Sequence, residues 1–408
     1  MERDCESELS KLNIEQNACI YHFGASVIHG QRSNILRLQQ TKEIESSEKE
    51  IRKIFKDGQG ILRLFPNYVC MGKEIQKGCK IQIGKTVERR LAYTGEEDEK
   101  IAGSKVCVSY ESNRYFSFQQ VINVLQEDLI GRELYERYRN WPIYGKLTNN
   151  EKKVEELGSA ESERVLRQSV KNLKKPHCNY VLDKRNETNN FQYILLGLDP
   201  DSEMSEIKKI MDKSNGEIRS IAKWFRLYQM GRKSGWYIPE GVFYMSFEGY
   251  IYEICWNSFV DVKGRKRASR KEEFFESFDW EKNTDVHFKK RCFRPPIIAG
   301  ESKKYSEKWI AYGNKYMSAK ELIIHPGEKA IIKDGAAYCC LVTQGYGKLG
   351  NYDVEMLFNP CIGKQSSDEF FVSENTAKEG VLIENFSKTE PLIMLKCFGP
   401  NHPDVLKG

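Results

Sequence analysis

The feature that most constrains the fold is the alternation of short apolar segments with turn residues between Tyr305 and Pro400. The clearest strand-like segments are Glu369–Ser373 and Pro391–Pro400. The turn signals between them are His325-Pro326-Gly327, Lys333-Asp334-Gly335, Gln344-Gly345-Tyr346-Gly347, Glu379-Gly380 and Thr389-Glu390-Pro391. Short strands at regular spacing predict an antiparallel β-sandwich or barrel with no long helix, and a short helical turn at most over Ser373–Lys378.

Length and composition indicate a folded protein of two to three domains, because domains usually hold about 100–200 residues and this chain has 408. Its 40% hydrophobic and 12% aromatic content is ordinary for globular proteins. The net charge of +6, from 64 basic and 58 acidic residues, is a small excess. It does not indicate a nucleic-acid partner or an anionic membrane surface.

Targeting and redox features predict a cytoplasmic location. No apolar run approaches the length of a membrane span, and the acidic start Met1–Glu6 lacks the apolar core of a secretory signal. The 12 cysteines form no CxxC pair, and Cys339 and Cys340 are simply adjacent. This spacing favours reduced thiols over disulfides and argues against a cysteine zinc site.

Helical periodicity predicts three helices. They cover Glu43–Phe55, which Gly58-Gln59-Gly60 ends, then Ser117–Tyr138 as one amphipathic helix, and Ser205–Met230 with a break at Asn215-Gly216. Strand-like segments lie within Ile61–Tyr110, Phe191–Leu198 and Trp236–Phe259.

Two charged segments separate these elements. Glu151–Lys175 is nearly free of β-branched residues and predicts a helix or a mobile loop. The basic run Lys263–Arg267, with Arg270 and Lys271, could contact phosphates. A solvated loop is favoured because the run is short and has no interleaved aromatic residues.

Several short sequence segments, hereafter phrases, occur along the chain in an order that is typical of one protein family. They are Glu88–Ala92, Asp128–Gly131, Arg139–Lys146, Leu195–Pro200, Gly235–Val242 and Phe278–Asp285, followed by the C-terminal strand-turn phrases. In this order they resemble a bacterial bicupin family similar to class I mannose-6-phosphate isomerase. The resemblance implies a mainly β fold of tandem cupin β-barrels with helical decorations. It implies an N-terminal lead-in (1–60), a first barrel with helical insertions (61–300) and a second barrel (301–408).

In that family, the first barrel holds a divalent metal with histidines and a carboxylate, a donor set that can polarise a sugar carbonyl. The resemblance places these ligands at three positions, all of which differ here. Glu151–Gly158 contains no histidine, the Lys-Pro-Glu phrase reads Lys175-Pro176-His177, and the Val-Leu-His phrase reads Val242-Phe243-Tyr244. No histidine lies between Gly30 and Pro176, so no shift in alignment restores the cluster.

The histidine census gives the same result without the family. The 6 histidines are His22, His29, His177, His287, His325 and His402. None forms an HxH, HxxH or HxxxH pair, so a first-row metal site would need distant residues to converge. We therefore expect no metal and no other cofactor.

Three of the candidate site residues, Lys146, His177 and Tyr244, come from the same resemblance, and Arg226 is added from the neighbouring predicted helix. His177 and Tyr244 are the candidate catalytic residues, since a lone imidazole can act as a general base near neutral pH. Lys146 and Arg226 are the candidate ligand-binding residues, which would neutralise a phosphate or carboxylate at the barrel mouth. The more ordinary interpretation of His177, a partly buried or surface histidine after a proline, stays open and is favoured.

Two other arrangements of the first barrel are open. Glu155 and Glu156 could join His177 and Tyr244 in an oxygen-rich site, although acidic residues in a charged segment are usually solvated. Alternatively, an aromatic plug would fill the pocket and leave no ligand site; it would consist of Phe243, Phe247 and Tyr252.

Two motifs in the second barrel are interpreted as turns. Gly345–Gly350 has GxGxxG spacing, but no helix follows it, so a hairpin is expected. His325-Pro326-Gly327 lacks a second histidine two residues on and predicts a turn between strands.

Together these features predict a sugar- or sugar-phosphate-related bicupin without a conventional metal site. If the protein is an enzyme, the resemblance implies an aldose–ketose isomerase-like activity. The alternative is a non-catalytic pseudoenzyme that binds a small ligand or a protein. The expected partner is a small sugar or sugar phosphate, with neither a membrane nor a nucleic acid, and the sequence leaves a homo-oligomer open.

Overall fold

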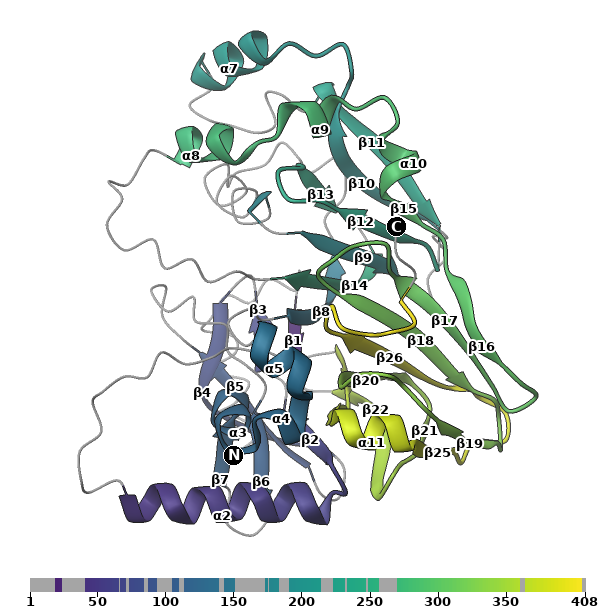
Figure 1. Ribbon diagram of the computed structural model, residues 1–408. Coiled ribbons are helices and arrows are strands. Elements are labelled where there is room, and N and C mark those ends of the chain that lie inside the picture. Colours follow the sequence, from purple (N-terminus) through teal and green to yellow (C-terminus); the bar gives the residue numbers. More distant parts are fainter. Residues whose placement is uncertain are drawn as a thin grey trace. The chain divides into compact units, whose positions relative to one another are not determined.

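The fold is known from a computed structural model (Figure 1). It describes residues 19–23, 41–65, 67–70, 73–83, 87–93, 105–109, 114–138, 143–150, 173–174, 176–182, 191–213, 223–231, 233–246, 249–256, 270–359 and 364–405. These residues are mainly in antiparallel β-strands, with short helices between them. The expectation of a mainly β fold with helical decorations is confirmed.

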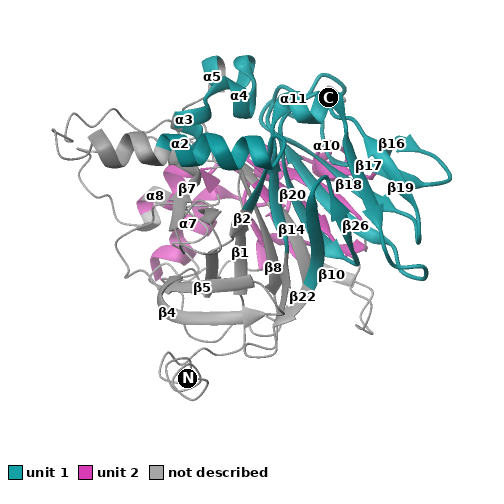
Figure 2. Cartoon of the chain, turned by 90° about the horizontal axis from the view of Figure 1, so that it is seen from below, with its two compact units in different colours: residues 1–146, 297–408 teal, residues 147–296 magenta. Residues whose placement is uncertain are grey.

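The contacts group the chain into two compact units (Figure 2). Unit 1 comprises residues 1–146 and 297–408, and unit 2 comprises residues 147–296. Strand β2 (Ile61–Phe65) pairs with β24 (Glu369–Val372), and this pairing joins the N-terminal part of the chain to the C-terminal part. The three-segment division into a lead-in and two cupin barrels stays a prediction.

Unit 1 contains a large antiparallel sheet. Its strands, in order, are β16 (Ile297–Glu301), β17 (Tyr305–Ala311), β18 (Ser318–Ile324), β26 (Leu392–Phe398), β20 (Tyr338–Gln344), β24, β2, β6 (Lys105–Ser109) and β7 (Arg114–Ser117). A smaller sheet has the order β19 (Lys329–Ile332), β25 (Val381–Asn385), β21 (Tyr346–Leu349), β22 (Tyr352–Asn359) and β23 (Lys364–Ser367). Four further strands pair in the order β1 (Cys19–Phe23), β3 (Asn67–Cys70), β4 (Lys73–Ile83) and β5 (Val87–Tyr93).

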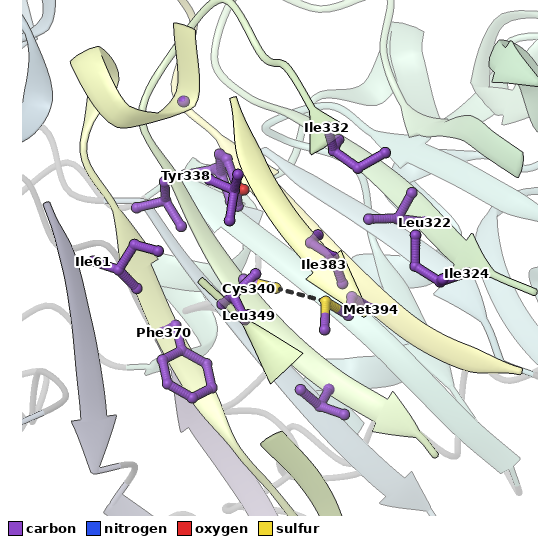
Figure 3. Packing of buried hydrophobic residues seen from close by; sticks show 14 of the residues in the cluster. Ile61, Leu322, Ile324, Ile332, Tyr338, Cys340, Leu349, Phe370, Ile383 and Met394 are labelled. Atoms are coloured by element: carbon purple, nitrogen blue, oxygen red, sulfur yellow. Dashed lines mark hydrogen bonds between the residues drawn. The ribbon is translucent and has the colours of Figure 1, made fainter. Parts of the chain in front are cut away.

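The large and small sheets of unit 1 enclose one apolar core (Figure 3). Leu322 and Phe370 come from the large sheet and Ile383 and Leu349 from the small one, and all four are fully buried. The thiol of Cys340 donates to Met394 Sδ at 3.6 Å within this core. Burial alternates along β19, β21 and β25 of the small sheet, as expected for a sheet with one buried face. Strands β18, β20, β24 and β26 of the large sheet are buried at nearly every position.

The expected turns in this region are confirmed. His325-Pro326-Gly327 connects β18 to β19, and the GxGxxG segment forms the hairpin of β21 and β22. The helix between Tyr305 and Pro400 in the described residues is α11 (Glu374–Glu379), which has 6 residues. The prediction of strands without a long helix is therefore confirmed for the described part of this region.

One predicted helix of unit 1 is confirmed and another is wrong. Helix α2 (Thr41–Asp57) covers the predicted segment and is followed by a turn in which Gln59 and Gly60 have φ angles of 52° and 79°. The single helix expected from Ser117 is instead broken into α3 (Phe118–Leu125), α4 (Glu127–Ile130) and α5 (Arg132–Tyr138). The breaks fall where φ is positive, at Gln126 (48°) and Gly131 (81°), a conformation that no α-helix continues through.

The turn after α2 is hydrogen-bonded to the N-terminal end of α11. The N–H of Ser373 donates to Gly60 O at 2.9 Å, and the hydroxyl of Thr376 donates to Gln59 O at 2.9 Å. A Cβ on Gly60 would lie 2.0 Å from Thr376 Oγ1, so the close approach requires glycine there. Arg63, farther along β2, donates to Asp368 Oδ1 at 2.7 Å. These contacts fix the N-terminal strand onto the C-terminal sheet.

Unit 1 also buries a ring of four charges. Lys320 Nζ lies 3.2 Å from Glu307 Oε2 and 2.8 Å from Asp334 Oδ1. Lys396 Nζ lies 2.6 Å from Asp334 Oδ2 and also contacts Glu307. Each ammonium thus bridges both carboxylates, and the ring, hereafter the charge ring, has no net charge. His402 adds its Nε2 at 3.6 Å from Asp334 Oδ1.

Unit 2 holds a second pair of antiparallel sheets. One contains β15 (Phe293–Arg294), β12 (Gly235–Ile238), β9 (His177–Val181) and β14 (Gly249–Trp256), in that order. The other has the order β11 (Phe225–Gly231), β10 (Phe191–Leu198) and β13 (Tyr244–Ser246). Strand β8 (Ile143–Asn150) crosses the boundary between the units. A shared apolar cluster contains Trp236 and Ile238 from the first sheet and Leu196 and Tyr244 from the second, so the two sheets face each other.

The helix predicted over Ser205–Met230 is only partly correct. Helix α7 covers Met204–Lys213, but the last residues form β11. Arg226, Tyr228 and Met230 are partly or fully buried while Leu227 and Gln229 are exposed, which is the two-residue period of a strand. Pairing with β10, whose residues lie 27–40 positions earlier in the chain than their partners on β11, decides the structure here.

Three short helices of unit 2 follow β14 in the chain. They are α8 (Arg270–Ser277), α9 (Trp280–Thr284) and α10 (Phe288–Cys292). The whole basic run Lys263–Arg267 lies outside the described residues, as does nearly all of Glu151–Lys175. No helix among the described residues is long and apolar enough to cross a membrane.

Candidate functional site in unit 2

The two candidate catalytic residues meet in the interior of unit 2. His177 opens β9 and Tyr244 opens β13, so they come from the two facing sheets. Tyr244 Oη lies 3.2 Å from His177 Nδ1, and the two rings pack edge to face with centroids 4.9 Å apart. Both side chains are buried, with exposed fractions of 1% and 4%. The structure thus brings together two residues that the sequence separates by 67 positions.

His177 lies in the interior, and its burial does not decide between its two interpretations. The side chain is 1% exposed, and one of its contacts is with the phenol that the sequence also singled out. The tautomer sets its chemistry. When the phenol donates to Nδ1, Nε2 carries the proton, and when Nδ1 donates to the phenol, Nε2 is an acceptor. The catalytic role of either residue stays a prediction.

A third polar residue, missed in the sequence, shares this interior. Asn179 follows His177 by two positions on β9 and therefore points to the same face of the strand. It is 1% exposed, and neither Oδ1 nor Nδ2 has a hydrogen-bond partner among the described residues. A buried carboxamide without partners is rare in proteins and calls for water or a ligand. The alternation His177-x-Asn179 was the available sequence signal.

A neighbour of Asn179 in the sheet extends the polar set. Trp236 on β12 lies directly opposite Asn179, and its buried Nε1 also has no partner among the described residues. Residues directly opposite in an antiparallel ladder share a face of the sheet. Trp236 and Asn179 therefore lie beside His177 on one face.

The loop that positions Tyr244 is fixed by Asn283 of α9. Its Nδ2 donates to Gly241 O at 2.7 Å, and its Oδ1 accepts from the N–H of Phe243 at 2.9 Å. Gly241 has φ of 87°, and a Cβ there would lie 2.6 Å from Asp279 Cβ. Two of the phrases that carry the family resemblance, Gly235–Val242 and Phe278–Asp285, are thus in contact because each completes the other's backbone hydrogen bonds.

The described contacts of Arg226 are with backbone carbonyl groups and an aromatic ring. Its guanidinium donates to Asp285 O at 2.8 Å and to Asn283 O at 2.7 Å, and it lies over the ring of Phe288 at 5.0 Å. These contacts tie β11 to the turn between α9 and α10. No contact of Arg226 with His177 or Tyr244 is found among the described residues. Its ligand-binding role is untested and stays a prediction.

Lys146 lies on β8, and its side chain is outside the described residues. Glu155 and Glu156 are also outside them. Their suggested places beside His177 therefore stay predictions.

Of the three residues suggested for the aromatic plug, only Phe243 has a described side chain. Phe243 is buried on the opposite side of β13 from Tyr244, stacked on Phe225 at 4.0 Å between ring centroids. It belongs to a separate cluster with Phe274 and the helices and does not cover His177. The side chains of Phe247 and Tyr252 lie outside the described residues.

The described donors do not fit the metal centre that the family resemblance implies. His177 offers one imidazole, whose Nδ1 is engaged by a phenol, and Tyr244 stands where a second imidazole is expected. A neutral phenol is a poor replacement for an imidazole as a ligand of a divalent cation. No three histidine, cysteine or acidic side chains come together as metal ligands in the part of the chain that the structure describes. Because Glu151–Gly158 lies outside that part, the absence of a metal stays a prediction.

Comparison with known proteins gives structural neighbours only. No family model and no curated protein sequence matches the chain. Mannose 6-phosphate isomerase from Bacillus subtilis is similar over 72% of this chain and 85% of its own, with 12% identity and a TM-score of 0.46. A variant of phosphomannose isomerase from Salmonella typhimurium is similar over 83% of this chain and 99% of its own, with 10% identity and a TM-score of 0.49. No residue role follows from similarity at this level.

Proposed function

We propose that the protein is a carbohydrate-related bicupin whose first barrel binds a sugar or sugar phosphate without a conventional metal centre. The observation that carries the proposal is the buried His177–Tyr244 pair, 3.2 Å apart, beside the amide of Asn179, which has no hydrogen-bond partner in the part of the chain that the structure describes. The order of the family-like phrases supports the carbohydrate class. Imidazole, phenol and carboxamide groups all donate and accept hydrogen bonds, which suits the hydroxyl and carbonyl oxygens of a sugar.

The same residues can support proton transfer. An aldose–ketose isomerisation removes a proton from the carbon beside the carbonyl and returns one to its neighbour. In the tautomer that leaves Nε2 unprotonated, His177 is the base for this step. Tyr244 selects the tautomer through Nδ1, and Asn179 would hold a substrate oxygen. Lys146 keeps its proposed role as the partner of a phosphate.

The alternative is a non-catalytic protein that binds a sugar in the same interior. It is favoured by the poor fit of the described donors to a divalent metal, because the resemblance implies metal-assisted chemistry. The two alternatives share the ligand and differ only in turnover.

One pair of measurements tests both. Isothermal titration calorimetry with mannose 6-phosphate, fructose 6-phosphate and the unphosphorylated sugars measures binding, and NMR of the same mixtures measures conversion. We expect binding in the wild type and at least a tenfold weaker affinity in Asn179→Leu and Tyr244→Phe. Tyr237→Phe is the matched control, since Tyr237 alternates with Trp236 and Ile238 and so faces away from the site.

The outcomes separate the alternatives. Binding with conversion assigns an isomerase, and binding without conversion assigns the non-catalytic protein. No binding of any of these sugars, or equal affinity in all variants, overturns the proposal.

A further inference from the structure

The outer face of the small sheet of unit 1 concentrates exposed apolar side chains. Ile331, Tyr346, Leu382 and Phe386 are 64%, 49%, 45% and 45% exposed. Ile331 lies directly opposite Leu382 on β19 and β25. Phe386 follows β25, and its N–H donates to Tyr346 O at 3.2 Å. These four residues, hereafter the apolar patch, lie on adjacent strands (Figure 1). Clustered exposed apolar residues mark interaction sites more often than scattered ones.

A row of charges crosses the apolar patch. Lys329 is directly opposite Glu384, Glu384 opposite Lys348, and Lys348 opposite Asp353. The row therefore runs Lys, Glu, Lys, Asp across β19, β25, β21 and β22, with the sign alternating at each strand. Each member is two positions from an exposed residue of the same strand, so the row and the apolar patch share one face. None of the four makes a salt bridge with another residue in the described ranges.

We propose that this face is the interface of a symmetric dimer, in which a second copy of the chain packs face to face against it. The two-fold axis lies in the plane of the interface, parallel to the strands, and passes through the centre of the row. Rotation about it places the row of one chain over the row of the partner in reverse order. Lys329 then faces the partner's Asp353, and Glu384 faces the partner's Lys348, so all four contacts join opposite charges. A two-fold axis along the row would bring each charge against its own copy and is excluded by repulsion.

The same axis also matches the apolar residues. This rotation exchanges β25 with the partner's β21 and keeps each residue at the same height along the strand direction. Phe386 therefore meets the partner's Tyr346, and one such aromatic pair forms on each side of the axis. Such aromatic pairs are stabilising beyond their buried area. Facing sheets pack about 10 Å apart at a small angle, which leaves room for these side chains.

The size of the face sets the strength of the dimer. Four strands about 4.8 Å apart and about five residues long give a sheet footprint of roughly 300 Å². Stable complexes usually bury about 800 Å² on each partner. The dimer is therefore weak, with a dissociation constant in the micromolar range or above, and it dissociates further as salt screens the charge row. It involves unit 1 alone and is independent of the proposed function.

Charge reversal tests the geometry by sedimentation velocity at about 5–300 μM protein and low salt. The wild type should shift toward a dimer as concentration rises. Glu384→Lys and Lys348→Glu should each raise the dissociation constant at least tenfold, because each places two like-charge contacts across the axis. An equimolar mixture of the two variants should associate again, since Lys at 384 then faces Glu at 348. Lys303→Glu, an exposed lysine outside this face, is the control and should associate like the wild type.

The mixture separates the proposed contact from simple damage to the sheet. Lys348 and Glu384 are neighbours within one chain, so either reversal also weakens an attraction inside the sheet. Such damage would not be repaired by mixing two variants. A wild type that stays monomeric at all concentrations, or a mixture that associates no better than either variant, overturns the proposal.

Discussion

The phenol oxygen of Tyr244 lies 3.2 Å from Nδ1 of His177, inside the sheet pair of unit 2. The two residues occupy positions where the family resemblance implies metal ligands, and they form a hydrogen-bonded pair there. A buried pair of this kind orients the imidazole and sets its tautomer. It therefore has consequences for stability as well as for the proposed ligand.

Removing the hydroxyl in Tyr244→Phe should lower the free energy of unfolding by about 1 kcal/mol, the usual net value of a buried hydrogen bond. The ring stays in the apolar cluster, so the fold is kept. Urea denaturation followed by circular dichroism measures the change. Tyr346→Phe, which alters an exposed phenol, is the matched control and should not change the free energy. A Tyr244→Phe protein as stable as the control would show that the hydroxyl contributes nothing to the interior.

Arg226→Met should destabilise unit 2 by about 2 kcal/mol, because two carbonyl oxygens lose a charged donor. Arg226→Lys keeps the charge but cannot bridge both carbonyls, so it should recover only part of the loss. Thermal unfolding of the three proteins checks this order. Weaker binding of sugar phosphates by Arg226→Met with unchanged stability would instead support the ligand-binding role expected from the sequence.

Lys396→Met should lower the free energy of unfolding by about 3–5 kcal/mol, because Glu307 and Asp334 would keep buried charges without their shared partner. Chemical denaturation measures the loss. Glu136→Gln breaks the exposed pair with Arg132 and should leave stability unchanged within error. Equal stability of both variants would mean that the charge ring is not formed in solution.

The charge ring also predicts how stability depends on acid. Burial alone would raise the pKa of the Asp334 carboxyl, but the charges of Lys396 and Lys320, together with the hydrogen bonds from His402 and Lys320, outweigh it and lower that pKa well below its usual range. The stabilisation is complete above the unfolded-state pKa of about 3.9 and is lost as the pH falls through the lower folded-state value. The difference in unfolding free energy between wild type and Asp334→Asn should therefore shrink below about pH 4. A difference that is constant from pH 6 to pH 2 would contradict this assignment.

The sequence pattern predicts those elements that depend on interactions between residues close together in the chain. The helix at Glu43–Phe55 and the glycine turn after it were predicted because amphipathic spacing and positive-φ residues act within a few positions. Phe225–Met230 was predicted as helix because its apolar spacing fits both periods, and pairing with β10 decided for a strand. The break at Gln126 carries no sequence signal of its own, since glutamine is an ordinary helix residue.

Only part of the candidate site could be predicted from the sequence. The resemblance points to His177 and Tyr244, whereas Asn179 is marked only by its alternation with His177, a signal too weak to single it out. The charge ring was also missed, because lysines such as Lys320 and Lys396 are expected at the surface. Only the register that places them side by side on β18 and β26 reveals that they share two carboxylates.

The central claim, a sugar site that works without a metal, is tested most directly by calorimetric titration of mannose 6-phosphate into protein dialysed against a chelator. The account predicts that binding persists with unchanged affinity after this treatment and is weakened at least tenfold by Asn179→Leu. Binding that disappears with the chelator and returns with one equivalent of zinc or manganese would contradict it.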